Sequence, residues 1–224
     1  MFCRRSHWSE HMPVIERAAA ECDRFVFNGD TFDFKWSELK TEEATVQAAI
    51  GFLRDFARRH PDTQIHVNLG NHDHHYQFMR ALDTLCEHTG NLSWHPYYLR
   101  VGNAVFLHGD VAMRRMTQPQ LERYRSRWLH ERRQGGLKRK VYDALFNARA
   151  HVAVSHVAFP GRLTVRRVHD YLDEIGHGPA SGIEQVYFGH THVPVRGRQY
   201  QGVRYHNGGA PMRHMDFTVL RANV

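Results

Sequence analysis

Apolar and polar residues follow one another along this chain in two kinds of pattern, one typical of strands and one typical of helices. Short apolar or alternating runs that stop at a glycine or a turn predict β-strands. Longer runs in which apolar residues recur every three or four positions predict amphipathic helices. The predicted strands are residues 25–28, 65–69, 97–101, 104–107 and 186–188, and the predicted helices are 9–22, 41–60, 75–88, 117–134, 137–149 and 162–175.

The order of these elements predicts the fold class. Strands and helices alternate in the first half of the chain, whereas residues 97–107 are typical of a hairpin and residues 195–223 alternate like a set of antiparallel strands. This order is typical of an α/β sandwich in which helices cover a sheet. The chain has 224 residues, of which 42% are hydrophobic, so we expect a single domain over 1–224 with a substantial core.

The composition also bears on where the protein works. No apolar run approaches the roughly 20 residues that cross a bilayer, and the first residues, MFCRRSHWSEH, lack the apolar core of a signal peptide. The three cysteines, Cys3, Cys22 and Cys86, are odd in number and have no CxxC spacing, which favours reduced thiols. We therefore expect a cytoplasmic protein.

The positive charge of the chain is concentrated in one segment. The formal net charge is +7; residues 114–140 hold ten Lys or Arg against the two acids Glu122 and Glu131, so this segment is +8 and the remainder is −1 by subtraction. Such a segment is either a solvated helix face or a surface for phosphates, anionic lipid headgroups or nucleic acid. Contact with anionic lipid would place the protein peripherally at the inner membrane.

Asp, Asn and His follow the ends of four predicted strands, each time next to a glycine. The carboxyl ends of strands in α/β folds are where ligands bind, and glycine permits the tight turn and close backbone approach that such a site needs. Oxygen and imidazole ligands without thiolate suit Mn²⁺, Fe or Zn²⁺. The four motifs are GDTFD (29–33), GNHD (70–73), HGD (108–110) and GHTH (189–192).

These motifs, in this order, resemble those of the calcineurin-like metallophosphoesterase superfamily, over roughly residues 24–208. The resemblance implies a four-layer αββα sandwich with a site for two divalent metal ions, Mn²⁺ first and Fe or Zn²⁺ as alternatives. It implies that Asp30 bridges both ions and that His192 serves one of them. The other ion would be completed by Asn71, His108 and His190.

The implied reaction is hydrolysis of a phosphodiester or pyrophosphate. Two cations lower the pKa of a bound water toward about 7, which supplies a hydroxide that attacks phosphorus. The resemblance places His72 beside the leaving group as proton donor, or on a phosphoryl oxygen, with Asp73 tuning it. A general acid of this kind contributes roughly 10²–10⁴-fold to the rate.

The first motif of the superfamily, Asp-x-His on a first strand, has no counterpart in this sequence. Residues 4–6 resemble the stretch that follows that motif, and no Asp precedes them. We therefore expect the first strand of the sheet to be missing from the chain as given, unless His7 or His11 replaces its ligands. The ion served by His192 would then have only that side chain and Asp30 from the protein, and would bind weakly.

Residues 111–178 lie between the third and fourth motifs, where members of the superfamily can carry a helical lid insertion. The layout resembles the branch that contains the UDP-2,3-diacylglucosamine pyrophosphatases, which implies a lipid-linked substrate whose phosphates contact Arg114 and Arg115. The GNHD motif departs from that branch, which has Arg in place of His72. The apolar residues of the segment are Met113, Met116, Leu121, Tyr124, Trp128 and Leu129. They would either cover acyl chains of the substrate or pack the lid on the domain, and the sequence favours neither explanation.

Two other functions compete with a lipid or small-molecule phosphoesterase. A catalytically impaired scaffold would explain the absent Asp-x-His, but it gives no reason to retain the polar cluster of His72, His108, His190 and His192. A nucleic-acid or nucleotide phosphodiesterase would use the basic segment, and its binding would weaken steeply with salt. Nothing in the sequence indicates an obligate protein partner.

Overall fold

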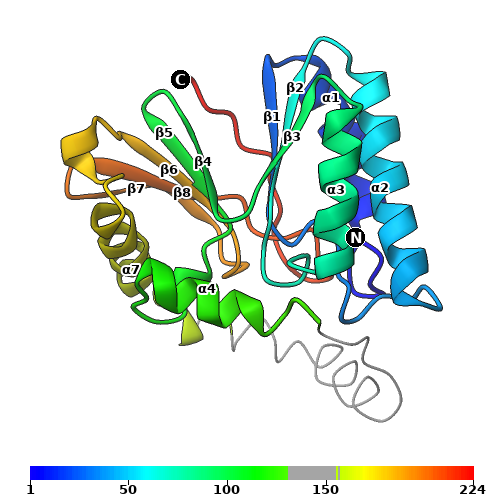
Figure 1. The fold of residues 1–224 in the computed structure, drawn as a ribbon. Coiled ribbons are helices and arrows are strands. Elements are labelled where there is room, and N and C mark those ends of the chain that lie inside the picture. The colour runs from blue at the N-terminus through cyan, green and yellow to red at the C-terminus, as the bar shows by residue number, and fades with distance from the viewer. Residues whose placement is uncertain (131–154, 156) are drawn as a thin grey trace.

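The computed structural model describes residues 1–130, 155 and 157–224, in which two β-sheets lie between layers of helices (Figure 1). The first sheet has three parallel strands in the order β1-β2-β3. Its outer face is covered by helices, and the alternation of the strands explains why: Phe25 and Phe27 of β1 pack in the helix-side core, whereas Asn28 faces the other sheet. The elements are α1 (Trp8–Ala20), β1 (Arg24–Asn28), α2 (Glu42–Arg59), β2 (Gln64–Asn68), α3 (Tyr76–Glu87) and β3 (Leu92–His95).

The second sheet has five strands in the order β4-β5-β6-β8-β7. The pairs β5–β6 and β6–β8 are parallel, and β4 and β7 pair antiparallel with β5 and β8. Helix α7 shares an apolar core with this sheet and covers its outer side (Figure 1). The elements are β4 (Tyr98–Val101), β5 (Ala104–Leu107), η1 (Asp110–Ala112), α4 (Gln118–Ser126), α7 (Gly161–Glu174), η2 (Pro179–Ser181), β6 (Gln185–Phe188), β7 (Val195–Tyr200) and β8 (Val203–Asn207).

Side-chain amides join the two sheets. The amide of Asn68 donates to Asn28 Oδ1 at 2.8 Å and to the carbonyl of Phe106 at 2.9 Å, and the amide of Asn28 donates to the carbonyl of Tyr187 at 3.0 Å. These bonds connect β1 and β2 of the first sheet with β5 and β6 of the second. The ends of four motif-bearing strands are thereby held at one side of the sandwich.

The α/β sandwich predicted from the sequence is confirmed. The predicted helix 41–60 is α2, which begins where the sequence indicated: Thr41 accepts a hydrogen bond from Ala44 N at 3.0 Å, and two Glu follow in the first turn. The absent first strand stays a prediction, and β1 is an edge strand of its sheet.

Three sequence-based assignments need correction. Strand β3 was not predicted, although Leu92 and Trp94 pack on one side of it. The predicted strand at the end of the tail does not form: among the described residues, 217–223 pair only at an isolated bridge between Phe217 and Gly209. The helix predicted over 117–134 ends at Ser126 and continues as turns to residue 130; the rest of it, and the helix predicted over 137–149, lie outside the described residues.

The lid predicted over 111–178 also lies partly outside the described residues. Within the described part, Met116 and Leu121 are buried in the core of the second sheet, together with Val165 and Val168 of α7. These apolar side chains therefore pack on the domain. No helix in the part of the chain that the structure describes is both long and apolar enough to cross a bilayer.

Candidate metal centre

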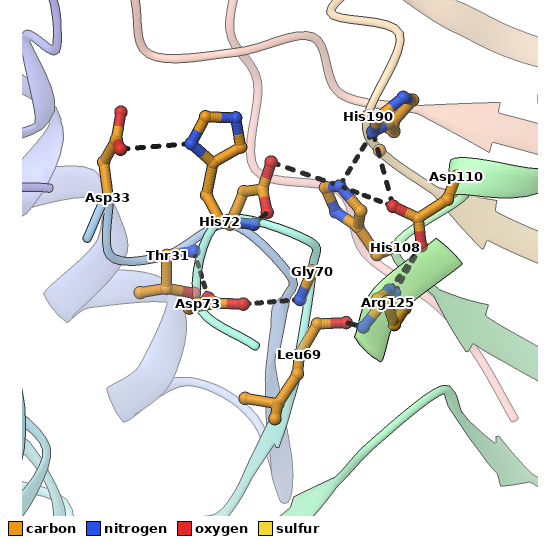
Figure 2. A network of polar contacts seen from close by, with 12 residues as sticks. Thr31, Asp33, Leu69, Gly70, His72, Asp73, His108, Asp110, Arg125 and His190 are labelled. Carbon is orange, nitrogen blue, oxygen red and sulfur yellow. Dashed lines mark hydrogen bonds and ion pairs between the residues drawn. The ribbon is translucent and has the colours of Figure 1, made fainter. Parts of the chain in front are cut away.

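Three of the four strand-end motifs bring ligand atoms together at one point. His108 Nε2 lies 3.0 Å from His190 Nδ1 (Figure 2) and 3.2 Å from Asp30 Oδ2. One ligand atom from each of the three residues lies within 4.8 Å of the others. These distances are typical of neighbouring ligand atoms that coordinate one small cation, whose bonds to nitrogen and oxygen are roughly 2.0–2.2 Å. The predicted ligands Asp30, His108 and His190, which come from β1, β5 and β6, therefore form a group that fits a divalent metal ion.

The backbone around this group is constrained. Asp30, His190 and His192 all have positive φ, at 51°, 59° and 58°, although they are not glycines. Such conformations cost roughly 1–3 kcal/mol each and concentrate at functional sites. Gly70 is needed for close approach as well, because a Cβ there would lie 2.0 Å from Asp30 Oδ1.

Two buried side-chain oxygens of the strand-end motifs have no hydrogen-bond partner among the described residues. Asn71, whose predicted role is to bind the same ion, is 3% exposed, and its Oδ1 is unpaired. Asp110 Oδ1 is unpaired as well and lies 3.6 Å from His190 Nδ1 and 3.7 Å from His108 Nε2. An unpaired buried oxygen is costly, and a cation would satisfy it, so the donor set fits a metal.

The surroundings shift the pKa values of the three clustered residues in different directions. Burial lowers the pKa of His190 to about 3, so its imidazole is neutral at physiological pH, as a metal ligand must be. The pKa of Asp30 lies well below its usual value, because the neighbouring His108 and His72 outweigh the effect of burial. Burial acts to lower the pKa of His108, but the carboxylates of Asp30 and Asp110 reverse this and raise it.

His72 lies beside the group and is held by a carboxylate. Its Nδ1 is 3.0 Å from Asp33 Oδ1, and its backbone N–H donates to Asp30 Oδ1 at 2.8 Å (Figure 2). Its ring lies 4.9 Å from the ring of Trp128, above which Lys35 Nζ lies at 4.6 Å. The His72 side chain is thus packed between the Asp33 carboxylate and an aromatic ring.

Asp73 affects His72 through its charge and not through a hydrogen bond, because its carboxylate is one of those that raise the pKa of His72. Its carboxylate accepts hydrogen bonds from Thr31 N at 2.8 Å and Gly70 N at 2.5 Å, and it is fully buried. Burial and the charge of Asp30 raise the pKa of Asp73 to about 6. Asp73 therefore joins the two loops that carry Asp30 and Asn71, while the carboxylate bonded to His72 belongs to Asp33.

The other predicted site residues are not part of the cluster of Asp30, His108 and His190. His192 is half-buried in the same turn as His190 but is not among the three clustered residues. Arg114 and Arg115 are exposed and lie on a pocket of ≈ 400 Å³ beside α4. The pocket is lined by Arg114, Arg115, Gln120, Arg123, Tyr124 and Arg127, and we call it the arginine pocket.

Sequence reasoning gave no role to three residues that the structure places at the site. Asp33 and Asp110 stand inside the quoted motifs, so the motifs themselves were the available signal. Arg125 is 1% exposed and bonds Asp110, but in the sequence it is one of ten Lys and Arg in a run and nothing distinguishes it from its neighbours.

Comparison with known proteins agrees with this geometry. Residues 6–194 match the family model described as calcineurin-like phosphoesterase. No match was found among curated proteins or among solved structures. The family model covers most of the chain and spans all four motifs, and the chain therefore belongs to the calcineurin-like phosphoesterases, a family of metal-dependent hydrolases of phosphoric esters.

Proposed function

We propose that the protein hydrolyses a phosphodiester or pyrophosphate bond in a phosphorylated small molecule or lipid, with two divalent metal ions, Mn²⁺ first, as cofactors. The observation that carries this proposal is the cluster of Asp30, His108 and His190 at the ends of three strands. Asn71 would complete one ion, and His192 with Asp30 would serve the other. Bound ions would supply positive charge for the phosphoryl oxygens and an activated water.

The protein's own residues have defined parts in this reaction. His72 is protonated in the metal-free protein, because the charges of Asp33 and Asp30 outweigh the effect of burial and raise its pKa to about 9. A protonated imidazole donates a proton to the departing oxygen or a hydrogen bond to a phosphoryl oxygen. Asp33 and Trp128 fix the direction in which the imidazole points.

The arginine pocket favours a substrate with a second anionic group. Arg114, Arg123 and Arg127 have no carboxylate partner in the part of the chain that the structure describes. The Nε atom of Arg115 lies 4.0 Å from Asp170 Oδ2, which is a long contact. Tyr124 lines the pocket, and its ring lies 6.4 Å from that of Trp128, which contacts His72. A substrate that carries an anionic group beyond the reacting phosphate, such as a nucleotide-linked lipid of the UDP-2,3-diacylglucosamine type, would match this charge.

The replacement His190→Ala tests the proposal. The Mn²⁺-loaded wild type should hydrolyse bis(p-nitrophenyl) phosphate or a pyrophosphate substrate, and the variant should lose both turnover and bound Mn²⁺. His88→Ala, at an exposed position after α3, is the matched control and should behave like wild type. Unchanged turnover in His190→Ala would refute the proposal, and an inactive Mn²⁺-loaded wild type would favour a scaffold.

The substrate class is tested separately. A lipid substrate should be turned over only with detergent or in vesicles containing anionic lipid, and the protein should then bind those vesicles peripherally. A nucleic acid should instead bind with an affinity that falls steeply as salt is raised.

A further inference from the structure

One buried guanidinium connects three separate parts of the site. Arg125 of α4 is 1% exposed, and its Nε donates to Asp110 Oδ2 at 2.7 Å, with Nη2 at 2.5 Å from the same oxygen. Its Nη1 donates to the carbonyls of Leu69 at 2.8 Å and Pro96 at 3.0 Å. Figure 2 shows the guanidinium between Asp110 and the backbone of Leu69, the residue before the GNHD motif.

Arg125 leaves one oxygen of Asp110 directed at the metal ligands. Because both guanidinium contacts fall on Oδ2, Oδ1 is unpaired and lies within 3.7 Å of the ring nitrogens of His108 and His190. The hydrogen bond to the Leu69 carbonyl fixes the start of the loop that carries Asn71. Two sides of the metal cluster therefore depend on the position of one side chain.

Stability alone does not require this arrangement. A buried ion pair costs desolvation energy, and apolar residues of similar volume are often equally stable or more stable in its place. Side chains that orient metal ligands, by contrast, typically change metal affinity by about 10–100-fold when they are altered. The Arg125–Asp110 pair lies beside the metal ligands, and this location favours a role in orienting those ligands.

We propose that Arg125 is a positioning residue of the metal centre, which holds the Asp110 carboxylate beside His108 and His190 and the loop of Asn71 in register, and thereby sets the affinity for the divalent ion. The inference rests on the proposed function only in that the cluster binds a metal. It gives the basic helix α4 a role in the metal site in addition to the arginine pocket.

Titration of the full metal-free chain with Mn²⁺, by calorimetry, tests this inference. Arg125→Lys keeps the charge but cannot bond one carboxylate and two carbonyls in the planar arrangement of a guanidinium. We expect it to bind Mn²⁺ about 10–100-fold more weakly than wild type. The electron paramagnetic resonance spectrum of bound Mn²⁺ should change even at saturating metal. Arg54→Lys, on the exposed side of α2, is the matched control and should leave the affinity for Mn²⁺ and the spectrum of the bound ion unchanged.

The outcomes separate the two proposals. If wild type binds Mn²⁺ and Arg125→Lys binds it equally well while melting earlier, Arg125 is structural only and the inference is overturned. If wild type takes up no divalent ion, the proposed function fails and the inference fails with it. If circular dichroism shows that Arg125→Lys does not fold, Asp110→Asn replaces it, because this variant keeps the side-chain shape and one oxygen for Arg125. We expect Asp110→Asn to show the same loss of affinity for Mn²⁺. Wild-type affinity in Asp110→Asn would overturn the inference.

Discussion

His72 shows how single contacts set the properties of the site. Its imidazole is held by Asp33 on one side and by Trp128 on the other. Burial disfavours the charged imidazole, but the carboxylates of Asp33, Asp30 and Asp73 outweigh burial and raise its pKa to about 9. The contribution of this charge to stability is therefore fully present below about pH 6.5 and is lost as the pH rises through about 9.

Asp33→Asn should lower the pKa of His72 in the metal-free protein. The substitution removes the charge that contributes most to holding the imidazole protonated and leaves Asp30 and Asp73 in place. Titration of the imidazole signals by NMR measures the change directly. Asp62→Asn, at an exposed turn, is the control and should leave the titration unchanged. A pKa of His72 that stays near 9 in Asp33→Asn would contradict this account.

Gly70→Ala should disrupt the metal cluster by steric clash alone. The added Cβ would lie 2.0 Å from Asp30 Oδ1 and 2.4 Å from Asp30 N, so Asp30 must move. We expect lost Mn²⁺ uptake and a free energy of unfolding lower by about 1–3 kcal/mol. Gly51→Ala in α2 meets no atom within 4 Å and should instead stabilise the protein by about 0.5–1 kcal/mol. Urea unfolding of both variants distinguishes the two effects, and equal stabilities would refute the prediction.

At the scale of elements, a carboxylate joins the first two helices. Glu16 of α1 lies 2.8 Å from Arg59 Nη2 and 2.6 Å from His60 Nε2, at the end of α2. Burial acts to raise the pKa of Glu16, but the hydrogen bonds from Arg59 and His60 outweigh it and lower the pKa below its usual 4.5. The stability that this carboxylate contributes is thus present above about pH 4.5 and is lost as the pH falls through the lowered pKa.

Glu16→Gln should lower the free energy of unfolding by about 0.5–1 kcal/mol at neutral pH, a modest loss because the Glu16 side chain is 30% exposed and solvent screens the pair. The difference from wild type should shrink as the pH falls below 4.5. Urea unfolding at several pH values measures it. A difference that is independent of pH would show that lost packing, and not the charge, is responsible.

At the scale of the whole molecule, the site exists because two sheets are held together. Asn68 is fully buried and bonds both Asn28 and the carbonyl of Phe106 on the opposite sheet. Asn68→Ala removes the donor to both of these acceptors and should lower the free energy of unfolding by about 1–3 kcal/mol in urea titration. The exposed Gln47→Ala should have little effect, and comparable losses in both would argue against the inter-sheet role.

Much of the fold could be predicted because its elements have local patterns. Helices α2 and α3 and strands β1 and β2 differ from their predicted bounds by one residue or so at each end. Strand β3 was missed because its sequence, LSWH, has no apolar run like those of the predicted strands. Its position depends on Asn91, whose amide bonds the carbonyls of Ala57, His60 and Thr63. The tail was assigned a strand because alternation persists there, but pairing depends on a partner edge that local pattern does not reveal.

The α/β class, the family and the cluster of Asp30, His108 and His190 can be read from local sequence, since apolar periodicity marks the strands and the motifs stand at their ends. The folded protein was needed to show that Asp33 bonds His72 across 39 positions of sequence and that Arg125, alone among the arginines of α4, is fully buried. These contacts join segments far apart in the chain. They follow from the packing of α4 against the strand ends, to which the residue types of a basic helix give no guide.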